Sequence, residues 1–600
     1  MTSTDSPTLR IRQSSWLWPV AILLLSIAWQ LHCALHGLDL TDEGYLMSVY
    51  EWFGTDITAA KGAGGYPLTC WLGWFVAHYL PGNGLLAMRL WGVLLVTLTE
   101  VIAYLWLRRW FSSRLLLVGL FIQLVFVSGD PKPLGYNTLT GLFYLLALIA
   151  TIEGLTRNRY LLLFVGGMFV GVNIWIRLPN IIGLCLLLIP LCWRFLNPDY
   201  GVKRAVNDSL WMLYGLAVSF ITVMLLILQT GVGEQLEEFL LSISGQLGGN
   251  SSHASGTMFL TYLKNYGEAL LYLVIFLATI AAFSFGSQLI RSPRKTWHRP
   301  CGVLLFLMAV ITLIGLLYIQ SDVLGHRILS TMNGIALAGC IVLLTEKSQP
   351  ILKGIALAAI LMALLCPLGS DRGFVTMWVG TWMALPVGLC GLSKKVPANG
   401  LRPAVLVLLL IVILKIEVKA YYDPEPKYLK TAAIDSPQAN NIYTSERKTR
   451  VLNPLLKELR QYVKPGDTML IYDDSPMLYY LTQTKPFGGI SWPGVFVGQR
   501  YIQVFRKTLA DKPQLPVVVL QYFSTSGAWT AVDNSRYDTS KESNPDLRAM
   551  KEMLNGFLNL HGYHPVWSNG YYTIFLPVSE LSLLFAWNKK NDAVINDGVA

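Results

Sequence analysis

Long apolar runs alternate with short polar segments along most of the chain. Each run approaches the roughly twenty residues that an α-helix needs to cross about 30 Å of hydrocarbon. About thirteen such runs can be distinguished by this length criterion, so the pattern predicts a polytopic α-helical membrane protein. The expected spans are 16–36, 85–107, 115–128, 134–153, 161–175, 178–195, 209–230, 268–290, 302–319, 325–344, 351–368, 374–392 and 403–417.

Composition and charge support this class. Hydrophobic residues make up 53% of the chain and charged residues 14%, which is typical of a membrane protein. The formal net charge is +11, and Lys and Arg gather in the loops that would be cytoplasmic if the amino terminus lies inside. The basic excess therefore indicates orientation in the bilayer, and we expect no nucleic-acid partner.

An odd number of spans places the tail on the side opposite to the amino terminus. The tail opens with a polar stretch, 423–450, which we expect to be a linker, and then alternates between helical and β-rich patterns. We therefore divide the chain into a membrane domain, 1–420, with a first periplasmic loop, 37–84, and a soluble periplasmic α/β domain, 421–600. The elements expected in the tail are helices 453–463 and 546–560 and strands 468–472, 517–522 and 571–576.

The loop between the first two spans is too long and too apolar for a simple connector. Its pattern predicts two helices at the membrane surface, 41–53 and 66–79, joined by a glycine-rich turn at 62–65. Thr41 is the expected N-cap of the first helix. The second helix carries Trp71 and Trp74, aromatic residues of the kind found at bilayer interfaces.

Two acids, Asp42 and Glu43, stand at the start of the first of these helices. Ionisable residues beside a bilayer usually have a function. The alternative is that both acids only offset the helix dipole, which stabilises by about 0.3–1 kcal/mol each. Successive helical side chains point about 100° apart, so we expect different tasks for the two. The position favours function for Asp42 and leaves both interpretations open for Glu43.

Several short motifs follow one another in a particular order along the first part of the chain. They are Asp42-Glu43 with Tyr45 after the first span, Pro67-Leu68 followed by Trp71-Leu72, and Ala87-Met88-Arg89-Leu90 at the second span. With the layout of about thirteen spans and an exported tail, they resemble the GT-C class of membrane glycosyltransferases, particularly the aminoarabinose transferase and protein O-mannosyltransferase relatives in glycosyltransferase family 39. In that family a lysine commonly stands next to the Pro-Leu element, whereas here residues 62–66 separate Lys61 from it.

The resemblance implies a sugar donor carried on a polyprenyl phosphate and an envelope acceptor, either a glycolipid, a polysaccharide or a protein. Inverting transfer needs a carboxylate to deprotonate the acceptor and cations to stabilise the departing phosphate. We expect Asp42 to be the base and Glu43 to orient or bind. Arg89, Arg177 and Lys61 are the expected phosphate-binding cations. For the two arginines, snorkelling to the interface is the alternative.

Further polar residues are expected at the same membrane boundary, where they could line one cavity: Tyr45, Asp322, His326, Arg327 and Arg372. Asp322 and His326 are spaced to share a helix face, either as a pH-sensitive pair or as an ordinary helix-start cap. The sequence requires no metal or other cofactor, although the oxygen atoms of Asp42, Glu43 and Glu234 suit a divalent cation.

Two other classes of membrane protein fit parts of the pattern. One is a transporter or lipid flippase, although the chain shows no internal repeat of the kind such folds often have. The other is a polysaccharide ligase or polymerase resembling O-antigen ligases, which would use exported Arg and His residues. The short amino-terminal tail and the lack of cysteines after Leu401 favour the inner membrane of a bacterium, with the amino terminus in the cytoplasm.

Overall fold

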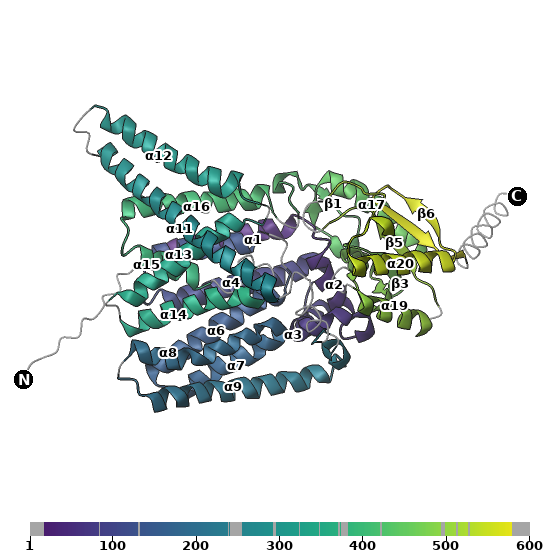
Figure 1. Ribbon diagram of the computed structural model, residues 1–600, viewed down its shortest axis with the longest axis horizontal. Coiled ribbons are helices and arrows are strands. Elements are labelled where there is room, and N and C mark those ends of the chain that lie inside the picture. The colour runs from purple at the N-terminus through teal and green to yellow at the C-terminus, as the bar shows by residue number, and fades with distance from the viewer. Residues whose placement is uncertain are drawn as a thin grey trace, which may run out of the picture.

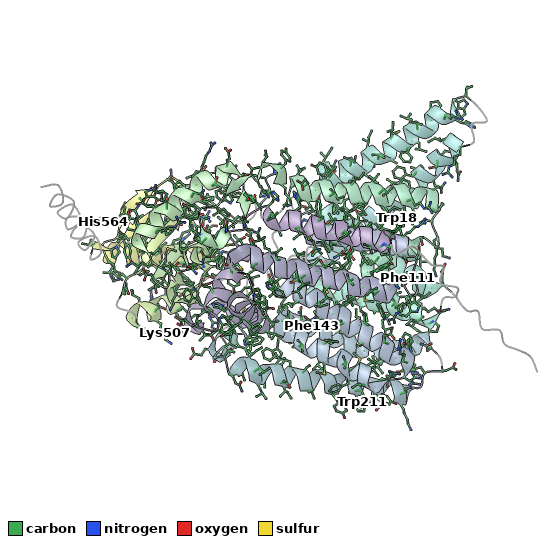
Figure 2. The ribbon with its side chains drawn as sticks, turned by 180° about the vertical axis from the view of Figure 1, so that it is seen from behind. Trp18, Phe111, Phe143, Trp211, Lys507 and His564 are labelled. Atoms are coloured by element: carbon green, nitrogen blue, oxygen red, sulfur yellow. The ribbon has the colours of Figure 1, made fainter. Side chains whose placement is uncertain are left out.

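Long helices form one bundle, and a smaller α/β domain caps one end of it in the computed structural model (Figure 1). Trp18 lies at the far end of the bundle from His564 and Lys507, which belong to the α/β domain (Figure 2). The structure describes residues 17–578 except 83, 130–132, 198, 238, 241–254, 292–295, 323, 347–348, 370–372, 374–381, 421–422, 494–497, 512–513 and 526–528.

The bundle is built from helices whose side chains are apolar on most faces, as expected for segments covered by lipid or by one another. Trp18 and Trp211 are 62% and 37% exposed on the sides of the bundle (Figure 2). The helices are α1 (Leu17–Leu35), α4 (Gly84–Leu107), α5 (Ser113–Val127), α6 (Tyr136–Arg157), α7 (Tyr160–Ile176), η3 (Leu178–Leu188), α8 (Ile189–Leu196), α9 (Val202–Leu228), α11 (Ser255–Arg291), α12 (His298–Ile314), η4 (Gly315–Ile319), α13 (His326–Thr345), α14 (Pro350–Leu365), η5 (Cys366–Gly369), α15 (Ala384–Leu392) and α16 (Ala398–Val418).

The expected spans coincide with these helices. In the described part of the chain, nine helical segments are long and apolar enough to cross a membrane, and α5 and α7 are apolar but shorter. Part of the expected span 374–392 lies outside the described residues, and α16 carries charges at both ends. A multi-span membrane protein is thus confirmed, whereas the number thirteen stays a prediction.

Between α1 and α4 the chain forms α2 (Asp42–Trp52), η1 (Ile57–Ala59), η2 (Lys61–Gly65) and α3 (Pro67–Tyr79). The two helices predicted for this loop are confirmed. They lie where the bundle meets the carboxy-terminal domain (Figure 1). The cap predicted from Thr41 is wrong, because the Thr41 side chain makes no capping hydrogen bond and its hydroxyl instead donates to Asp39 Oδ1 at 2.7 Å.

The carboxy-terminal domain contains a five-stranded sheet in the order β4-β3-β5-β7-β6. Strands β3 (Thr468–Tyr472), β4 (Lys485–Pro486) and β5 (Val517–Gln521) are parallel, and β7 (Tyr572–Leu576) pairs antiparallel with both β5 and β6 (His564–Ser568). A small ladder joins β1 (Ala432–Ala433) to β2 (Tyr443–Thr444). The helices are α17 (Glu446–Tyr462), α18 (Met477–Thr482), α19 (Gln499–Asp511) and α20 (Pro545–Leu560). The predicted α/β character is confirmed.

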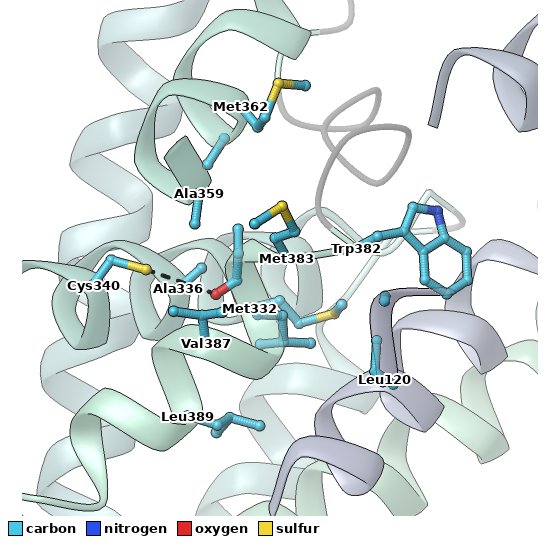
Figure 3. Close-up of a cluster of buried hydrophobic side chains, with 14 of the residues drawn as sticks. Leu120, Met332, Ala336, Cys340, Ala359, Met362, Trp382, Met383, Val387 and Leu389 are labelled. Carbon is cyan, nitrogen blue, oxygen red and sulfur yellow. Dashed lines mark hydrogen bonds between the residues drawn. The ribbon is translucent and has the colours of Figure 1, made fainter. Parts of the chain in front are cut away.

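Three apolar cores hold these parts together. The first lies inside the bundle, where Met332 and Ala336 of α13 face Val387 of α15 and Met362 of α14 (Figure 3). A second core continues from α2 and α3 into one face of the sheet, and a third fills the other face beneath α19 and α20. The carboxy-terminal domain therefore shares a core with the loop that precedes α4.

The stretch predicted to be a linker is instead anchored at this junction by buried charges. Asp423 is fully buried and accepts hydrogen bonds from Lys448 Nζ at 2.5 Å, the backbone N–H of Leu38 at 3.0 Å and Thr444 Oγ1 at 3.1 Å. Lys430 Nζ lies 3.4 Å from the same carboxylate. Polar residues are common in linkers, but here the charges of Asp423, Lys430 and Lys448 are buried against one another, so they fasten the domain to the loop.

Candidate functional site

A buried acid that the sequence did not single out holds the first turn of α2. Asp39 is 1% exposed and accepts hydrogen bonds from the N–H of Thr41 at 2.8 Å and the N–H of Glu43 at 2.9 Å. These N–H groups belong to the helix terminus that lacks intrahelical partners. Burial, together with the nearby charge of Asp42, raises the pKa of Asp39 to about 7. Asp39 thus fixes the position of the Asp42 backbone.

Glu43 points away from this turn into a buried ion pair with Arg89 of α4. Arg89 Nε and Nη2 donate to the two Glu43 oxygens, each at 2.7 Å, and the side chains are 0% and 1% exposed. Arg89 also donates to the backbone carbonyls of Ala34 at 2.7 Å and Gly37 at 2.9 Å. The arginine therefore ties together α1, α2 and α4. This geometry favours a structural task over the phosphate role expected for Arg89.

Asp42 occupies the same turn but remains half-buried. Its charge contributes to the raised pKa values of Tyr45 and Tyr66, in both of which burial is the larger cause. Tyr45 Oη donates to the carbonyl of Gly62 at 2.8 Å, which anchors η2 next to Lys61. A Cβ at Gly62 would lie 2.2 Å from that hydroxyl oxygen, so this position requires glycine.

Aromatic rings connect Asp42 to Arg177. Tyr66 stacks on Tyr136 of α6 with centroids 4.3 Å apart and an interplanar angle of 11°. The Arg177 guanidinium carbon lies 5.5 Å from the Tyr136 ring centroid, a cation–π geometry. Arg177 stands at the break between α7 and η3 in extended backbone. Its charge opposes the effect of burial on the pKa of Tyr66.

We call Asp42, Tyr45, Tyr66, Tyr136 and Arg177 the loop cluster. All five side chains are half-buried, so each keeps some surface that a ligand can reach. One carboxylate and one guanidinium separated by aromatic rings can bind a polar ring compound with an anionic substituent. Lys61 directly precedes Gly62, which binds Tyr45 of this cluster. The Lys61 side chain also packs closely against Gly489 of the carboxy-terminal domain, because a Cβ added at Gly489 would lie 3.0 Å from Lys61 Cγ.

The remaining predicted residues form a second group around the start of α13. Asp322 Oδ1 accepts from the N–H groups of Gly325 at 2.8 Å and His326 at 2.9 Å, and Asp322 Oδ2 pairs with His326 Nδ1. Burial raises the pKa of Asp322, but these hydrogen bonds outweigh it and lower the value below the usual range. This arrangement matches the helix-start cap that the sequence allowed as one interpretation.

Arg327 completes that group. It donates to Gln320 Oε1, and its guanidinium carbon lies 5.9 Å from the Tyr272 ring centroid. The contacts of this group are therefore with η4 and α11 rather than with the loop cluster. Arg372 lies outside the described residues. In the part of the chain that the structure describes, no group of three or more His, Cys, Asp or Glu residues could hold a metal ion.

Sequence reasoning did not find Asp39, Tyr66 or Tyr136. For Asp39 a signal existed, since an acid a few residues before Glu43 is well placed to accept from the first N–H groups of a helix. Tyr136 carried no such signal, because it follows an unrelated span 70 residues after Tyr66 in a chain containing 28 tyrosines. Only the fold brings these two rings together.

The apolar bundle and the domain at its end define a multi-span membrane protein with a terminal α/β domain. No family model and no curated protein matches the chain. Among solved structures, the chain is similar to the oligosaccharyltransferase of Archaeoglobus fulgidus. The form named AglB, in complex with an inhibitory peptide and a dolichol-phosphate, is 11% identical over 88% of this chain and 75% of that chain, with a TM-score of 0.43.

Two further structures of the Archaeoglobus fulgidus enzyme are similar to the same degree. The form tethered to an acceptor peptide containing the NVT sequon is 10% identical over 88% of this chain and 75% of that one, with a TM-score of 0.44. The apo form is 11% identical over 92% and 80%, also with a TM-score of 0.44.

Proposed function

We propose that this protein is a membrane glycosyltransferase that moves a sugar from a polyprenyl-phosphate donor to an envelope acceptor, with Asp42 as the base. The membrane is the inner membrane of a bacterium, and the reaction takes place on the periplasmic side, where the carboxy-terminal domain sits. One observation carries the proposal: Asp42 alone of the three acids at the start of α2 remains half-buried in a cluster with aromatic rings and a cation, whereas Asp39 and Glu43 are committed to holding the structure.

The proposed reaction is a single displacement. A hydroxyl oxygen of the acceptor attacks the anomeric carbon of the sugar and loses its proton to Asp42. The bond between that carbon and the phosphate oxygen breaks as the new bond forms, and polyprenyl phosphate leaves with the electron pair. Arg177 and Lys61 are cations already in position, and they stabilise the negative charge that develops on the departing phosphate. The rings of Tyr66 and Tyr136 would pack against the sugar.

The test compares wild-type protein with Asp42→Asn and Arg177→Gln, at matched protein levels. Asp42→Asn keeps the shape of the side chain and removes its basicity, so transfer should fall by about 10²–10⁴-fold. Arg177→Gln should raise the KM for the donor. Asp435→Asn, which alters a carboxylate with a 52% exposed side chain on the carboxy-terminal domain, is the matched control and should behave like wild type.

Mass spectrometry of lipid-linked sugars and envelope glycans from such cells supplies the readout. Accumulated polyprenyl-phosphate sugar and one missing glycan modification in Asp42→Asn cells would support the transferase and identify its substrates. Unchanged pools would contradict it and favour a transporter or flippase. Loss of glycan ligation on replacing His326 or Arg372, with Asp42 dispensable, would favour the polysaccharide ligase.

A further inference from the structure

A second group of polar side chains gathers at the sheet of the carboxy-terminal domain. Asp473 and Asp474 directly follow β3, and Ser524 follows β5, which is the parallel neighbour of β3 in the sheet. Ligands of open sheets bind preferentially outside the carboxyl ends of parallel strands, where the loops diverge. The position of these residues is therefore the edge at which a binding site is expected.

The side chains at this edge form one network. Arg536 Nε donates to Asp473 Oδ2 at 2.9 Å, and Arg536 Nη2 lies 3.4 Å from Asp474 Oδ2. Trp492 Nε1 donates to Asp474 Oδ1 at 3.2 Å, and Ser524 Oγ donates to Asp474 Oδ2 at 3.0 Å. We call Asp473, Asp474, Trp492, Ser524 and Arg536 the strand-edge cluster. It carries two negative charges and one positive charge.

The network leaves hydrogen-bonding capacity unused. Among the described residues, none donates to Asp473 Oδ1, and the Asp473 side chain is 23% exposed. Within the same described part, the hydroxyls of Tyr501 and Ser491 have no hydrogen-bond partner although these residues are only 2% and 4% exposed. Burying a polar group without a partner costs about 1–3 kcal/mol.

Of these two residues, Tyr501 packs against the end of β3. The Tyr501 ring lies 6.3 Å from the ring of Tyr472, the last residue of β3. Burial raises the pKa of Tyr501, and the charge of Asp473 adds a smaller effect in the same direction. Ser491 directly precedes Trp492 in the chain. Buried polar groups usually have a hydrogen-bond partner, and an ordered water or a ligand hydroxyl would satisfy these two.

The strand-edge cluster also borders the loop cluster. The Trp492 ring lies 6.3 Å from the Tyr45 ring at an angle of 60°. Behind this contact, α18 packs on α2, where the Met477 N–H donates to the Leu40 carbonyl at 3.1 Å. Figure 1 shows α2 between the bundle and the sheet. A molecule bound at the strand edge would thus reach towards Asp42 past Tyr45 and Trp492.

We propose that the strand-edge cluster is the subsite that holds the acceptor, and that this part of the acceptor is a carbohydrate without negative charge. Carboxylates and a serine hydroxyl suit the hydroxyl groups of a sugar, and an aromatic ring suits its apolar face. The excess of one negative charge in the cluster disfavours a phosphorylated or acidic ligand and favours a neutral or amino sugar. This inference rests on the proposed function, because it assigns the acceptor of the same reaction.

The experiment measures transfer by the full-length protein in membrane vesicles. Cells carrying Asp42→Asn supply both substrates, namely the accumulated lipid-linked donor and the unmodified envelope glycan, which mild acid releases as the acceptor probe. Asp473→Asn and Trp492→Ala should each raise the KM for this acceptor about tenfold or more. The kcat and the KM for the donor should stay within about twofold of wild type, because the substituted residues contact only the acceptor. Asp435→Asn is again the control, and Ser524→Ala is a milder variant should either of the others fail to fold.

The outcomes separate the two proposals. If Asp42→Asn transfers as well as wild type, the proposed function fails and the acceptor subsite fails with it. If Asp42→Asn is inactive but the strand-edge variants keep a wild-type KM for the acceptor, only the subsite is overturned. Proteinase K treatment of the probe is the last arm: loss of acceptor activity would show a peptide acceptor and would overturn the carbohydrate assignment, whereas retained activity supports it.

Discussion

Replacing Arg89 with Met should destabilise the protein strongly without a specific effect on donor binding. The substitution removes four hydrogen bonds, two to Glu43 and two to the carbonyls of Ala34 and Gly37, and leaves the Glu43 carboxylate buried at 1% side-chain exposure. Removing one partner of a buried ion pair typically costs about 3–5 kcal/mol, because the remaining charge loses both its partner and its water. For cooperative unfolding of a chain of 600 residues, Arg89→Met should therefore lower the apparent Tm by roughly 2–4 °C.

A double-mutant cycle isolates the pair. Glu43→Gln alone leaves a buried guanidinium, so it should also destabilise, whereas the double variant with Arg89→Met removes both charges and should recover much of the loss. Thermal unfolding of the purified proteins in one detergent gives the Tm values, and transfer assays give the KM for the donor. Arg109→Met is the matched control, because Arg109 pairs with Glu153 at 51% exposure and such pairs contribute about 0–1 kcal/mol.

If Arg89→Met keeps the wild-type Tm and raises the KM for the donor, Arg89 binds the donor phosphate, as the sequence pattern suggested, and the buried pair is not its main task. An equal fall in the stability of Arg109→Met would also contradict the argument, since it would show that any loss of an ion pair has the same effect in this bundle.

Three further outcomes follow from other contacts. Gly44→Ala should destabilise the protein although alanine favours helices, because a Cβ at Gly44 would lie 2.3 Å from the backbone of α18. Gly267→Ala is the control. A Cβ at Gly267 would have no atom within 4 Å, so this variant should be neutral or stabilising in the same thermal scan. Asp423→Asn should lower the Tm, since it leaves the buried Lys448 without a counter-charge. Burial raises the pKa of Asp423, but the neighbouring lysines outweigh burial and lower this pKa to about 2. The stabilisation by Asp423 should therefore be present at neutral pH and lost as the pH falls below 4 towards 2. For Asp39 the pH dependence of stability has the opposite sign. Its pKa in the folded protein is about 7, so between about pH 4 and 7 the folded state holds a proton that the unfolded state has released, and stability should fall as the pH rises through that window. Asp39→Asn should flatten this fall in unfolding curves recorded at successive pH values.

Much of the fold could be predicted because membrane burial imposes a simple pattern. A span must be long and apolar, so α4, α9 and α13 are visible in the sequence as runs of hydrophobic residues. Strands β3 and β5 were equally visible, since a strand buried on both faces is a short run of β-branched and aliphatic residues. In both cases the local sequence alone carries the information.

The stretch around Asp423 shows where such reasoning ends. Its polar composition is that of a linker, and nothing local distinguishes a solvated lysine from one buried beside a carboxylate. Lys448 and Lys430 are buried because Asp423 and the Leu38 backbone, 385 residues apart in the chain, meet at the junction of the two domains. A charge is tolerated in a core only when a partner is placed beside it, and that placement is a property of the whole fold.

The same limit applies to the three acids in residues 39–43. The sequence could indicate that one of them is a base, but it could not distinguish the roles of the three. Asp39, Asp42 and Glu43 have the same chemistry in the sequence, and only their partners divide them. Asp39 accepts the N–H groups of the helix terminus, and Glu43 is paired with Arg89, and both side chains are buried away from a substrate. Asp42 is the only one of the three that is half-buried, and the other two hold the turn that places it beside Tyr66. A catalytic base must be both held in place and left exposed, and in this loop the buried acids supply the first condition and thereby permit the second.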